Sequence, residues 1–256
     1  MRYRLDLAYD GTAFCGWQSQ PDGRTVQQVT EAALTLLLRQ SVYLTGSGRT
    51  DTGVHAHEQP THFEVETPIA DVGQVLYRLA RLLPPDVKPT ALYPVPDEFH
   101  ARFSALERTY HYHLHQRPDP FQRFFSAFVG QSLDFGLMNE AAALLLGEHD
   151  FTTFSKTKGN VTHYRGRVSE ARWTLDEAVD TATFIVTANR FLRGQVRLLV
   201  GTLLDVGRGR LTVAGFGAAL AARDRARSSG AAPAEGLTLW RVTYPPKMAE
   251  ADEGDA

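Results

Sequence analysis

The fold is set near the amino terminus by the stretch Tyr3-Arg4-Leu5-Asp6-Leu7-Ala8-Tyr9-Asp10-Gly11. Apolar side chains alternate with polar or small ones along residues 3–9, which is the two-residue period of a half-buried β-strand. The last two residues of the stretch are turn formers that end the strand. Further along, Thr25 and Gln28 have the spacing of a capping box, and the apolar residues that follow repeat with the helical period. The sequence therefore predicts a strand followed by an amphipathic helix.

The same reasoning extends to the rest of the chain. In the first half we predict short strands at residues 42–44 and 63–65, and a helix at residues 72–83 that Pro84 and Pro85 stop. In the second half we predict strands at residues 110–114, 184–188 and 237–244, helices at residues 134–146 and 192–207, an Ala-rich helix reaching Arg227, and an exposed loop at residues 155–167.

This order of elements predicts an α+β protein. We expect two similar α/β halves, each a mostly antiparallel sheet flanked by helices, with a cleft between them. The domains are assigned to residues 1–105 and 106–246, and residues 247–256 to an acidic tail that we expect to be disordered.

Composition narrows the class of protein. Hydrophobic residues make up 43% of the 256 residues and charged residues 22%, which allows a packed core and excludes global disorder. The single cysteine, Cys15, excludes an internal disulfide and a zinc site built from cysteines. No apolar run approaches the ~20 residues that span a bilayer, and the charged start of the chain does not resemble a signal peptide. We expect a cytoplasmic protein with no membrane partner.

The net charge of −2 hides an uneven distribution. Four acidic residues lie after Met248, so the body of the chain carries 27 basic residues against 25 acidic ones. Only four of the basic residues are lysines, and arginine is the side chain best suited to phosphate and to planar stacking. A GC-rich genome would also enrich arginine and alanine, so composition permits a nucleic-acid partner without requiring one.

The densest polar cluster lies at residues 46–57, where glycines separate Arg49, Asp51 and two histidines. A cationic neighbour such as Arg49 would keep Asp51 ionised, and an ionised carboxylate beside a cleft can act as a nucleophile. The alternative is that Asp51 only caps a turn. Asp51-Thr52-Gly53 also spells the aspartic-protease triplet, but that chemistry needs two such carboxylates and the sequence holds no second copy.

Two histidine runs raise the question of a metal site. His55, His57 and His62 form the first run, and His111, His113 and His115 form the second. Neither run has a carboxylate at a recognisable metal spacing. We therefore expect solvated strand faces or contacts with substrate phosphates, and no metal.

The basic residues after Asn189 indicate an anionic partner. On a helix, Arg190, Arg193 and Arg197 would lie on one side, next to the apolar stripe. Arg197 would be nearest the apolar side and would need a carboxylate partner, for which Asp51 is a candidate. Among the aromatic residues, Tyr110 is distinguished by its place beside Arg108 at a strand start, as expected for a ring that stacks on an unpaired base.

Taken together, these segments resemble the tRNA pseudouridine synthase A family along residues 3–245. The stretches that carry the resemblance are Tyr9-Asp10-Gly11-Thr12, Gly16-Trp17-Gln18, Gly48-Arg49-Thr50-Asp51-Thr52-Gly53-Val54-His55-Ala56, Phe99-His100-Ala101-Arg102-Phe103-Ser104-Ala105, His149-Asp150-Phe151, Val196-Arg197, Val200-Gly201-Thr202-Leu203-Leu204 and Glu235-Gly236-Leu237. The chain departs from the family pattern at Gly194, where many members have histidine or another polar residue.

The resemblance implies an isomerase that converts uridine to pseudouridine at positions 38, 39 and 40 in the anticodon arm of tRNA. It implies no metal or organic cofactor, and a homodimer with a positively charged cleft for the tRNA. Asp51 would be the nucleophile, with Arg49 and Arg197 as the basic residues around it. Tyr110 would stack on the target base, and Arg190, Arg193 and Leu237 would bind the substrate. Two competing interpretations remain open: a tRNA-binding module without catalysis, and a hydrolase of the aspartic or metal-dependent type.

Overall fold

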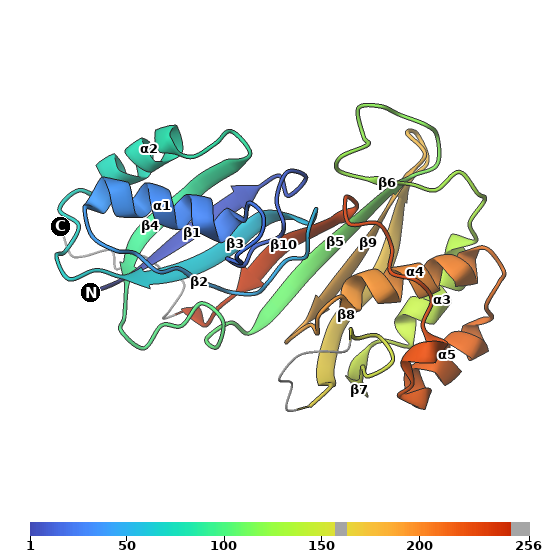
Figure 1. Ribbon diagram of the computed structural model, residues 1–256. Coiled ribbons are helices and arrows are strands. Elements are labelled where there is room, and N and C mark those ends of the chain that lie inside the picture. Colours follow the sequence, from blue (N-terminus) through green and yellow to red (C-terminus); the bar gives the residue numbers. More distant parts are fainter. Residues whose placement is uncertain (157–162, 247–256) are drawn as a thin grey trace. The chain divides into compact units, whose positions relative to one another are not determined.

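The computed structural model describes residues 1–156 and 163–246, and within them the chain divides into two units (Figure 1). Unit 1 comprises Met1–Leu106 and the residues from Leu239 onward, and unit 2 comprises Glu107–Thr238. Residues 106–246, predicted to form the second domain, therefore include residues from Leu239 onward that belong to unit 1. The return of the chain to unit 1 is fixed by the Leu106 amide, which donates to the Thr243 carbonyl over 2.8 Å, and by the Tyr244 hydroxyl, which donates to the Ala101 carbonyl over 2.6 Å.

Unit 1 is a sheet with two helices on one face. Its elements are β1 (Arg2–Tyr9), α1 (Val26–Leu38), β2 (Thr45–Gly46), β3 (His55–Glu64), α2 (Val72–Leu82), β4 (Val87–Val95) and β10 (Leu237–Thr243). The main strands follow the order β4-β1-β3-β10, and β1 pairs antiparallel with both β3 and β4. Leu5 and Leu7 of β1 are fully buried, and Figure 1 shows α1 and α2 on the same side of this sheet.

The predicted amino-terminal cap of α1 is confirmed. The Gln28 amide donates to the Thr25 hydroxyl over 3.3 Å, and the Gln28 side-chain oxygen accepts from the Thr25 amide over 3.2 Å. The predicted strand at residues 42–44 is wrong. The Val42 and Leu44 amides donate to the Thr35 and Glu31 side chains of α1 instead, over 3.2 and 2.8 Å. These bonds to α1 use the amides that a strand ladder would need.

Strand β4 was not predicted, because prolines at 89 and 94 interrupt its pattern. Proline lacks the amide that a central strand donates, but an edge strand tolerates it. In the described order β4 is the terminal strand, next to β1 alone. Its position in the sheet therefore explains how a sequence with two prolines is still a strand.

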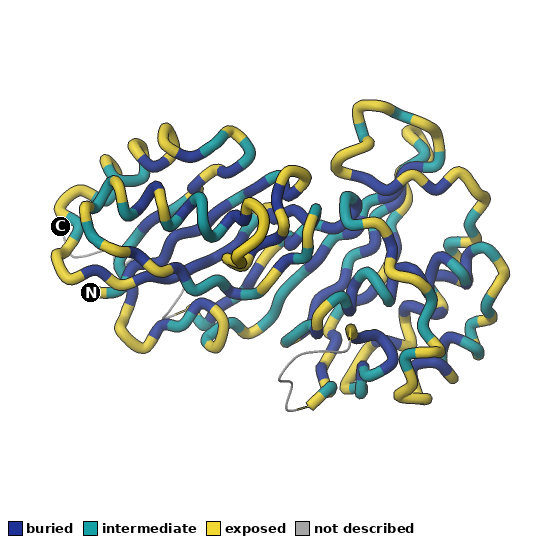
Figure 2. The backbone as a smooth tube through the Cα atoms, viewed as in Figure 1, coloured by how far each residue is buried: buried dark blue, intermediate teal, exposed yellow. Residues whose placement is uncertain are grey.

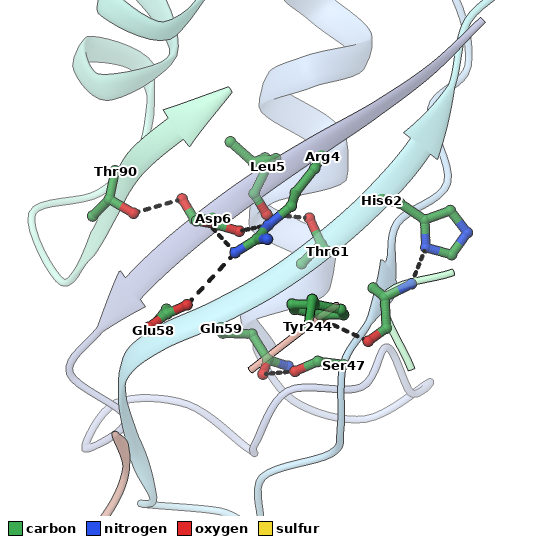
Figure 3. A network of polar contacts seen from close by, with 11 residues as sticks. Arg4, Leu5, Asp6, Ser47, Glu58, Gln59, Thr61, His62, Thr90 and Tyr244 are labelled. Carbon is green, nitrogen blue, oxygen red and sulfur yellow. Dashed lines mark hydrogen bonds and ion pairs between the residues drawn. The ribbon is translucent and has the colours of Figure 1, made fainter. Parts of the chain in front are cut away.

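The polar positions of β1 are buried as well, so β1 is not the half-buried strand that its alternation predicted. Arg4 and Asp6 are only 5% and 8% exposed, and the Arg4 guanidinium donates to both Asp6 carboxylate oxygens over 2.7 and 2.8 Å (Figure 3). Glu58 of β3 lies 3.5 Å from the same guanidinium. Burial, followed by the proximity of Asp6, raises the pKa of Glu58, and burial also raises the pKa of Asp6.

Unit 2 has the same kind of architecture. Its elements are β5 (Glu107–His115), β6 (Ala127–Phe128), α3 (Phe135–Ala143), β7 (Gly147–Asp150), β8 (Arg165–Asp176), β9 (Thr181–Ala188), α4 (Gln195–Gly207), α5 (Val213–Ala222) and a short 3₁₀ turn (Arg225–Arg227). The strand order β5-β9-β8-β7 is antiparallel throughout, and β6 adds a parallel pair to β5. Along much of β5 and β9 half-buried residues alternate with buried ones, whereas β1 is buried almost continuously (Figure 2).

Three boundaries in unit 2 differ from the predictions. Strand β8 begins at Arg165, inside the predicted loop, of which residues 157–162 lie outside the described residues. Helix α5 ends at Ala222 rather than near Arg227, because Arg223 takes a left-handed conformation with φ of 53°. Helix α4 begins only at Gln195, although it ends at Gly207 as predicted. The predicted acidic tail also lies outside the described residues.

The α+β prediction is confirmed, because both units are mostly antiparallel sheets flanked by helices. Among the described residues, no helix combines the length and the apolar character required to cross a lipid bilayer.

Candidate active site

The loop that carries Asp51 runs from β2 to β3 and is anchored to β3 at its base. The Ser47 amide donates to the Pro60 carbonyl over 2.9 Å. Gln59, which is fully buried, accepts from the Ser47 hydroxyl over 3.0 Å and donates to the Gly48 carbonyl over 2.8 Å. One buried amide side chain therefore holds both the hydroxyl and the backbone at the start of the loop.

A second segment, residues 10–17, binds the other side of the Asp51 loop. The Trp17 amide donates to the Thr50 carbonyl over 3.2 Å, and the Gly53 amide donates to the Phe14 carbonyl over 3.3 Å. The Thr50 hydroxyl also shares a hydrogen bond of 2.9 Å with the Tyr9 hydroxyl. The backbone on both sides of Asp51 is thus fixed by a segment about forty positions away in the sequence.

Glycine makes this approach possible. A Cβ atom added to Gly11 would lie 2.1 Å from the Val54 carbonyl oxygen, and one added to Gly16 would lie 2.5 Å from the Thr50 carbonyl oxygen. Gly16 also has φ of 85°, where side chains with a Cβ are strained. The stretches that contain Gly11 and Gly16 therefore both pack directly against the backbone of the Asp51 loop.

Asp51 itself is half-buried on this rigid loop, while Arg49 is exposed. A carboxylate with a fixed backbone and a partly accessible side chain is suited to act as a nucleophile or a general base. The sequence permits an ion pair of Arg49 with Asp51 or with another group; within residues 1–156 and 163–246 Arg49 pairs with no carboxylate.

The first histidine run is largely structural, so the expected solvated strand face is wrong for two of its members. His55 is 2% exposed, and its Nδ1 atom accepts from the Gly11 amide over 3.0 Å. His62 is 7% exposed, and its Nδ1 atom accepts from the Ala101 amide over 3.1 Å. Burial, with a smaller effect from His100, lowers the pKa of His62 to about 4. Only His57 is exposed, with its ring stacked 4.5 Å from that of Trp240.

The second run is also engaged within the protein. His113 and His115 pair with the Thr183 and Ser126 hydroxyls, each over 3.0 Å, and His115 is buried. Across the part of the chain that the structure describes, no three His, Cys, Asp or Glu side chains are grouped so that they could hold a metal ion.

Tyr110 lies in unit 2, near the middle of β5, where it is paired with Val186 of β9. Tyr110 is 9% exposed. Its ring packs edge to face with the ring of Phe191, and the two ring centroids are 5.1 Å apart. The segment after β9 therefore contacts the ring that we expect to stack on the target base.

The predicted arginine face of a helix is wrong. Residues 189–194 are not helical, and α4 starts after Gly194, which caps it with φ of 70°. Arg190 lies in this segment and contacts the His163 ring over 3.2 Å, and Arg193 is exposed. Of the three arginines, only Arg197 belongs to α4. A left-handed glycine within an otherwise helical pattern gave too weak a signal to place the boundary.

Arg197 is tied to the segment that leads into β10. Its Nε atom donates to the Ala232 carbonyl over 2.7 Å, and its own carbonyl accepts from the Ala232 amide over 2.9 Å. Leu237 follows in the same segment and is 5% exposed. Arg197, Leu237, Tyr110, Arg190 and Arg193 all lie in unit 2, and Asp51 and Arg49 lie in unit 1. That these residues meet at one site stays a prediction.

Sequence reasoning missed the residues that support Asp51. Gln59, Thr50 and Tyr9 hold the loop, yet none was singled out. The only signal was indirect: Gln59 is the one side-chain amide in a strand whose other polar residues are histidines, glutamates and a threonine.

Known proteins are similar to this chain along most of its length. The family model described as tRNA pseudouridine synthase matches residues 7–104 and 141–245. A protein of Porphyromonas gingivalis named tRNA pseudouridine synthase A is 44% identical over 246 residues, which cover 95% of this chain and 97% of the relative. A protein of the same name from Bacteroides thetaiotaomicron is 45% identical over 245 residues, covering 95% of this chain and 91% of the relative. The chain therefore belongs to the tRNA pseudouridine synthase family.

Proposed function

We propose that this protein, an isomerase of that family, converts uridine to pseudouridine at positions 38, 39 and 40 in the anticodon arm of tRNA, and that Asp51 is the catalytic carboxylate. The observation that carries the proposal is the loop around Asp51. Its backbone is bonded to β3 and to residues 10–17, and the approach of those residues requires glycines. A loop fixed in this way holds one half-buried carboxylate in a constant position, which is what a reacting group needs.

The reaction breaks the N1–C1′ bond of uridine, turns the uracil and joins C5 to C1′; the proton on C5 is then lost and N1 takes up a proton. In one route the Asp51 carboxylate attacks C1′ and is later displaced by C5. In the other it removes the 2′ proton as the uracil leaves, which gives a glycal; C5 then bonds to C1′ while the proton returns to C2′. Both routes need an ionised Asp51, and both need the nucleotide outside the base stack. Because substrate and product contain the same atoms, we expect no metal or organic cofactor.

The other residues follow from this chemistry. Tyr110 would stack on the uracil while it is detached, an interaction worth ~1–3 kcal/mol. Arg49 and Arg197 would supply the positive charge near Asp51, and Arg190, Arg193 and Leu237 would contact the substrate. From the family resemblance we also propose a homodimer that acts in the cytoplasm.

The direct test is Asp51→Asn in the full chain, with mapping of pseudouridine in treated tRNA. We expect no pseudouridine, and tRNA affinity close to that of the wild type, since the change removes one negative charge from an anion-binding protein. Asp22→Asn, at an exposed position, is the matched control and should leave turnover unchanged. Normal turnover by Asp51→Asn would disprove the role of Asp51, and wild-type product at other positions would disprove the choice of the anticodon arm.

The same experiment distinguishes an isomerase from a protein that only binds tRNA. A protein that only binds tRNA would show affinity without pseudouridine in the wild type. The assay contains no added cofactor, so any pseudouridine that forms needs only the protein and the tRNA.

A further inference from the structure

We propose that Lys156 contacts a backbone phosphate of the bound tRNA, together with Arg193. The inference rests on the proposed function, because it deepens the description of how the substrate is held. It starts from Gly194, the residue that caps the amino end of α4.

Lys156 occupies the space where a side chain at position 194 would lie. A Cβ atom added to Gly194 would be 3.0 Å from both Cγ and Cε of Lys156 and 3.1 Å from Cδ. The lysine stem therefore lies along Gly194, and the left-handed conformation of the glycine, with φ of 70°, is the second reason that no side chain is accommodated there.

The backbone keeps Lys156 in this place. Its amide donates to the Arg193 carbonyl over 2.9 Å, so the two cationic residues are adjacent although they are far apart in the sequence. Residues 189–193 also include Phe191, whose ring contacts Tyr110. A short run of contacts thus joins Lys156 to the ring that we expect to hold the target base.

The charges around Lys156 favour a role of this residue in binding over a structural role. Arg165, Arg167, Arg190 and Arg193 lie in this part of unit 2. Arg165 faces Asp150 across the β7–β8 pair, whereas Arg167, Arg190 and Arg193 form no ion pair with a carboxylate in the described part of the chain. The cations at Arg24 and Arg208, by contrast, each have an acidic partner. A cation at the amino end of a helix also opposes the helix dipole, so Lys156 is not placed to stabilise α4. A polyanion such as an RNA backbone is complementary to this group of cations.

The test measures tRNA binding at several salt concentrations in the full chain carrying Asp51→Asn, which prevents turnover. Lys156→Met keeps an unbranched stem against Gly194 and removes only the charge. We expect a three- to tenfold weaker affinity near 0.1 M salt, and a slope of log affinity against log salt that is smaller by about 1. Lys156→Arg should keep the slope. Lys88→Met removes the same charge from an exposed position in β4 and should change neither quantity.

A second measurement tests the packing without RNA. Gly194→Ala should destabilise the protein to chemical denaturation, and the loss should be smaller when Lys156→Ala has cleared the space beside it. The remaining loss reports the left-handed backbone alone. Equal losses in the two backgrounds would disprove the contact between Lys156 and Gly194.

The outcomes separate the two proposals. If Lys156→Met binds tRNA with unchanged affinity and slope while the wild type forms pseudouridine, the inference fails and the proposed function stands. If the slope falls by about 1 but the wild type forms no pseudouridine, the phosphate contact stands and the function fails.

Discussion

The Asp51 loop and the segment at residues 189–194 are held by contrasting means. In the Asp51 loop, backbone groups are bonded on both sides, Thr50 and Val54 are buried, and the side chain of Asp51 between them is half-buried. In residues 189–194, the side chains that matter are long and cationic, and Arg193 is exposed. The first region fixes a single carboxylate, and the second presents flexible positive charge.

This difference matches two demands of the proposed reaction. Bond-making at C1′ depends on sub-ångström placement of one group, so the surrounding backbone has to be rigid. Attraction of phosphates falls off slowly with distance, so arginine and lysine side chains need no such precision. Changes in the first region should therefore affect chemistry, and changes in the second should affect affinity.

The largest effect is expected from Gly16→Ala. The new Cβ atom would lie 2.5 Å from the Thr50 carbonyl oxygen at a residue with φ of 85°, so the loop must shift. We expect pseudouridine formation to fall at least about 100-fold, with tRNA affinity nearly unchanged. Gly48→Ala is the control from the same loop, since its Cβ atom would meet nothing within 4 Å. A large loss of tRNA affinity in Gly16→Ala would show that the two regions are not separable.

Acid should act on β3, the strand that anchors the Asp51 loop, and not on the positive charges of residues 189–194. Because the folded pKa of His62 is about 4, against 6.5 normally, the unfolded chain binds the proton more readily. The stability contribution is therefore complete above pH 6.5 and falls as the pH drops towards 4, by at most about 2 kcal/mol at pH 5. Arginines keep their charge over this range.

The measurement is the free energy of unfolding at pH 7 and pH 5 for the wild type and for His62→Asn, which keeps an acceptor near the Ala101 amide. The wild type should lose more stability than the variant. Equal losses would show that His62 is not the group that titrates.

A smaller effect is expected from Arg193→Ala. Affinity for tRNA should fall several-fold and the salt slope should decrease by about 1, while the rate at saturating tRNA stays close to that of the wild type. Arg81→Ala, on the exposed side of α2, is a matched loss of charge in unit 1. An unchanged slope for Arg193→Ala would remove that residue from the RNA-contacting surface.

The smallest effect is expected from Tyr9→Phe. The change removes the hydroxyl that pairs with Thr50, a bond worth about 1 kcal/mol, and leaves the backbone contacts of the loop in place. Turnover should drop only a few-fold. Combining it with Thr50→Val in a double-mutant cycle should show that the two losses are not additive, whereas simple additivity would contradict the bond.

The sequence predicted elements whose signals are local. The strand β1 and the cap of α1 follow from alternation and from the spacing of Thr25 and Gln28, and both need only neighbouring residues. Elements that depend on tertiary position were not predictable in this way. Strand β4 contains two prolines that only an edge position tolerates, and α4 starts late because Gly194 adopts a conformation that sequence periodicity does not encode.

The candidate site was likewise predictable only where its signals are local in the sequence. Asp51 stood out because glycines and charges surround it, and the family motif assigned its role. The supports of Asp51 are buried polar groups whose partners lie far away in sequence, such as Gln59 with Gly48 and Tyr9 with Thr50. The burial of His55 and His62 was missed for the same reason, since alternation alone cannot distinguish a solvated face from one that loops cover.

The buried group formed by Arg4, Asp6 and Glu58 has a consequence for how this protein can diverge. Loss of the Arg4 guanidinium alone would leave the Asp6 and Glu58 carboxylates without their cation. Loss of Asp6 alone would leave Arg4 with only the more distant Glu58. Among descendants of this sequence the three positions should covary, with charged or apolar sets inherited together and single exchanges rare.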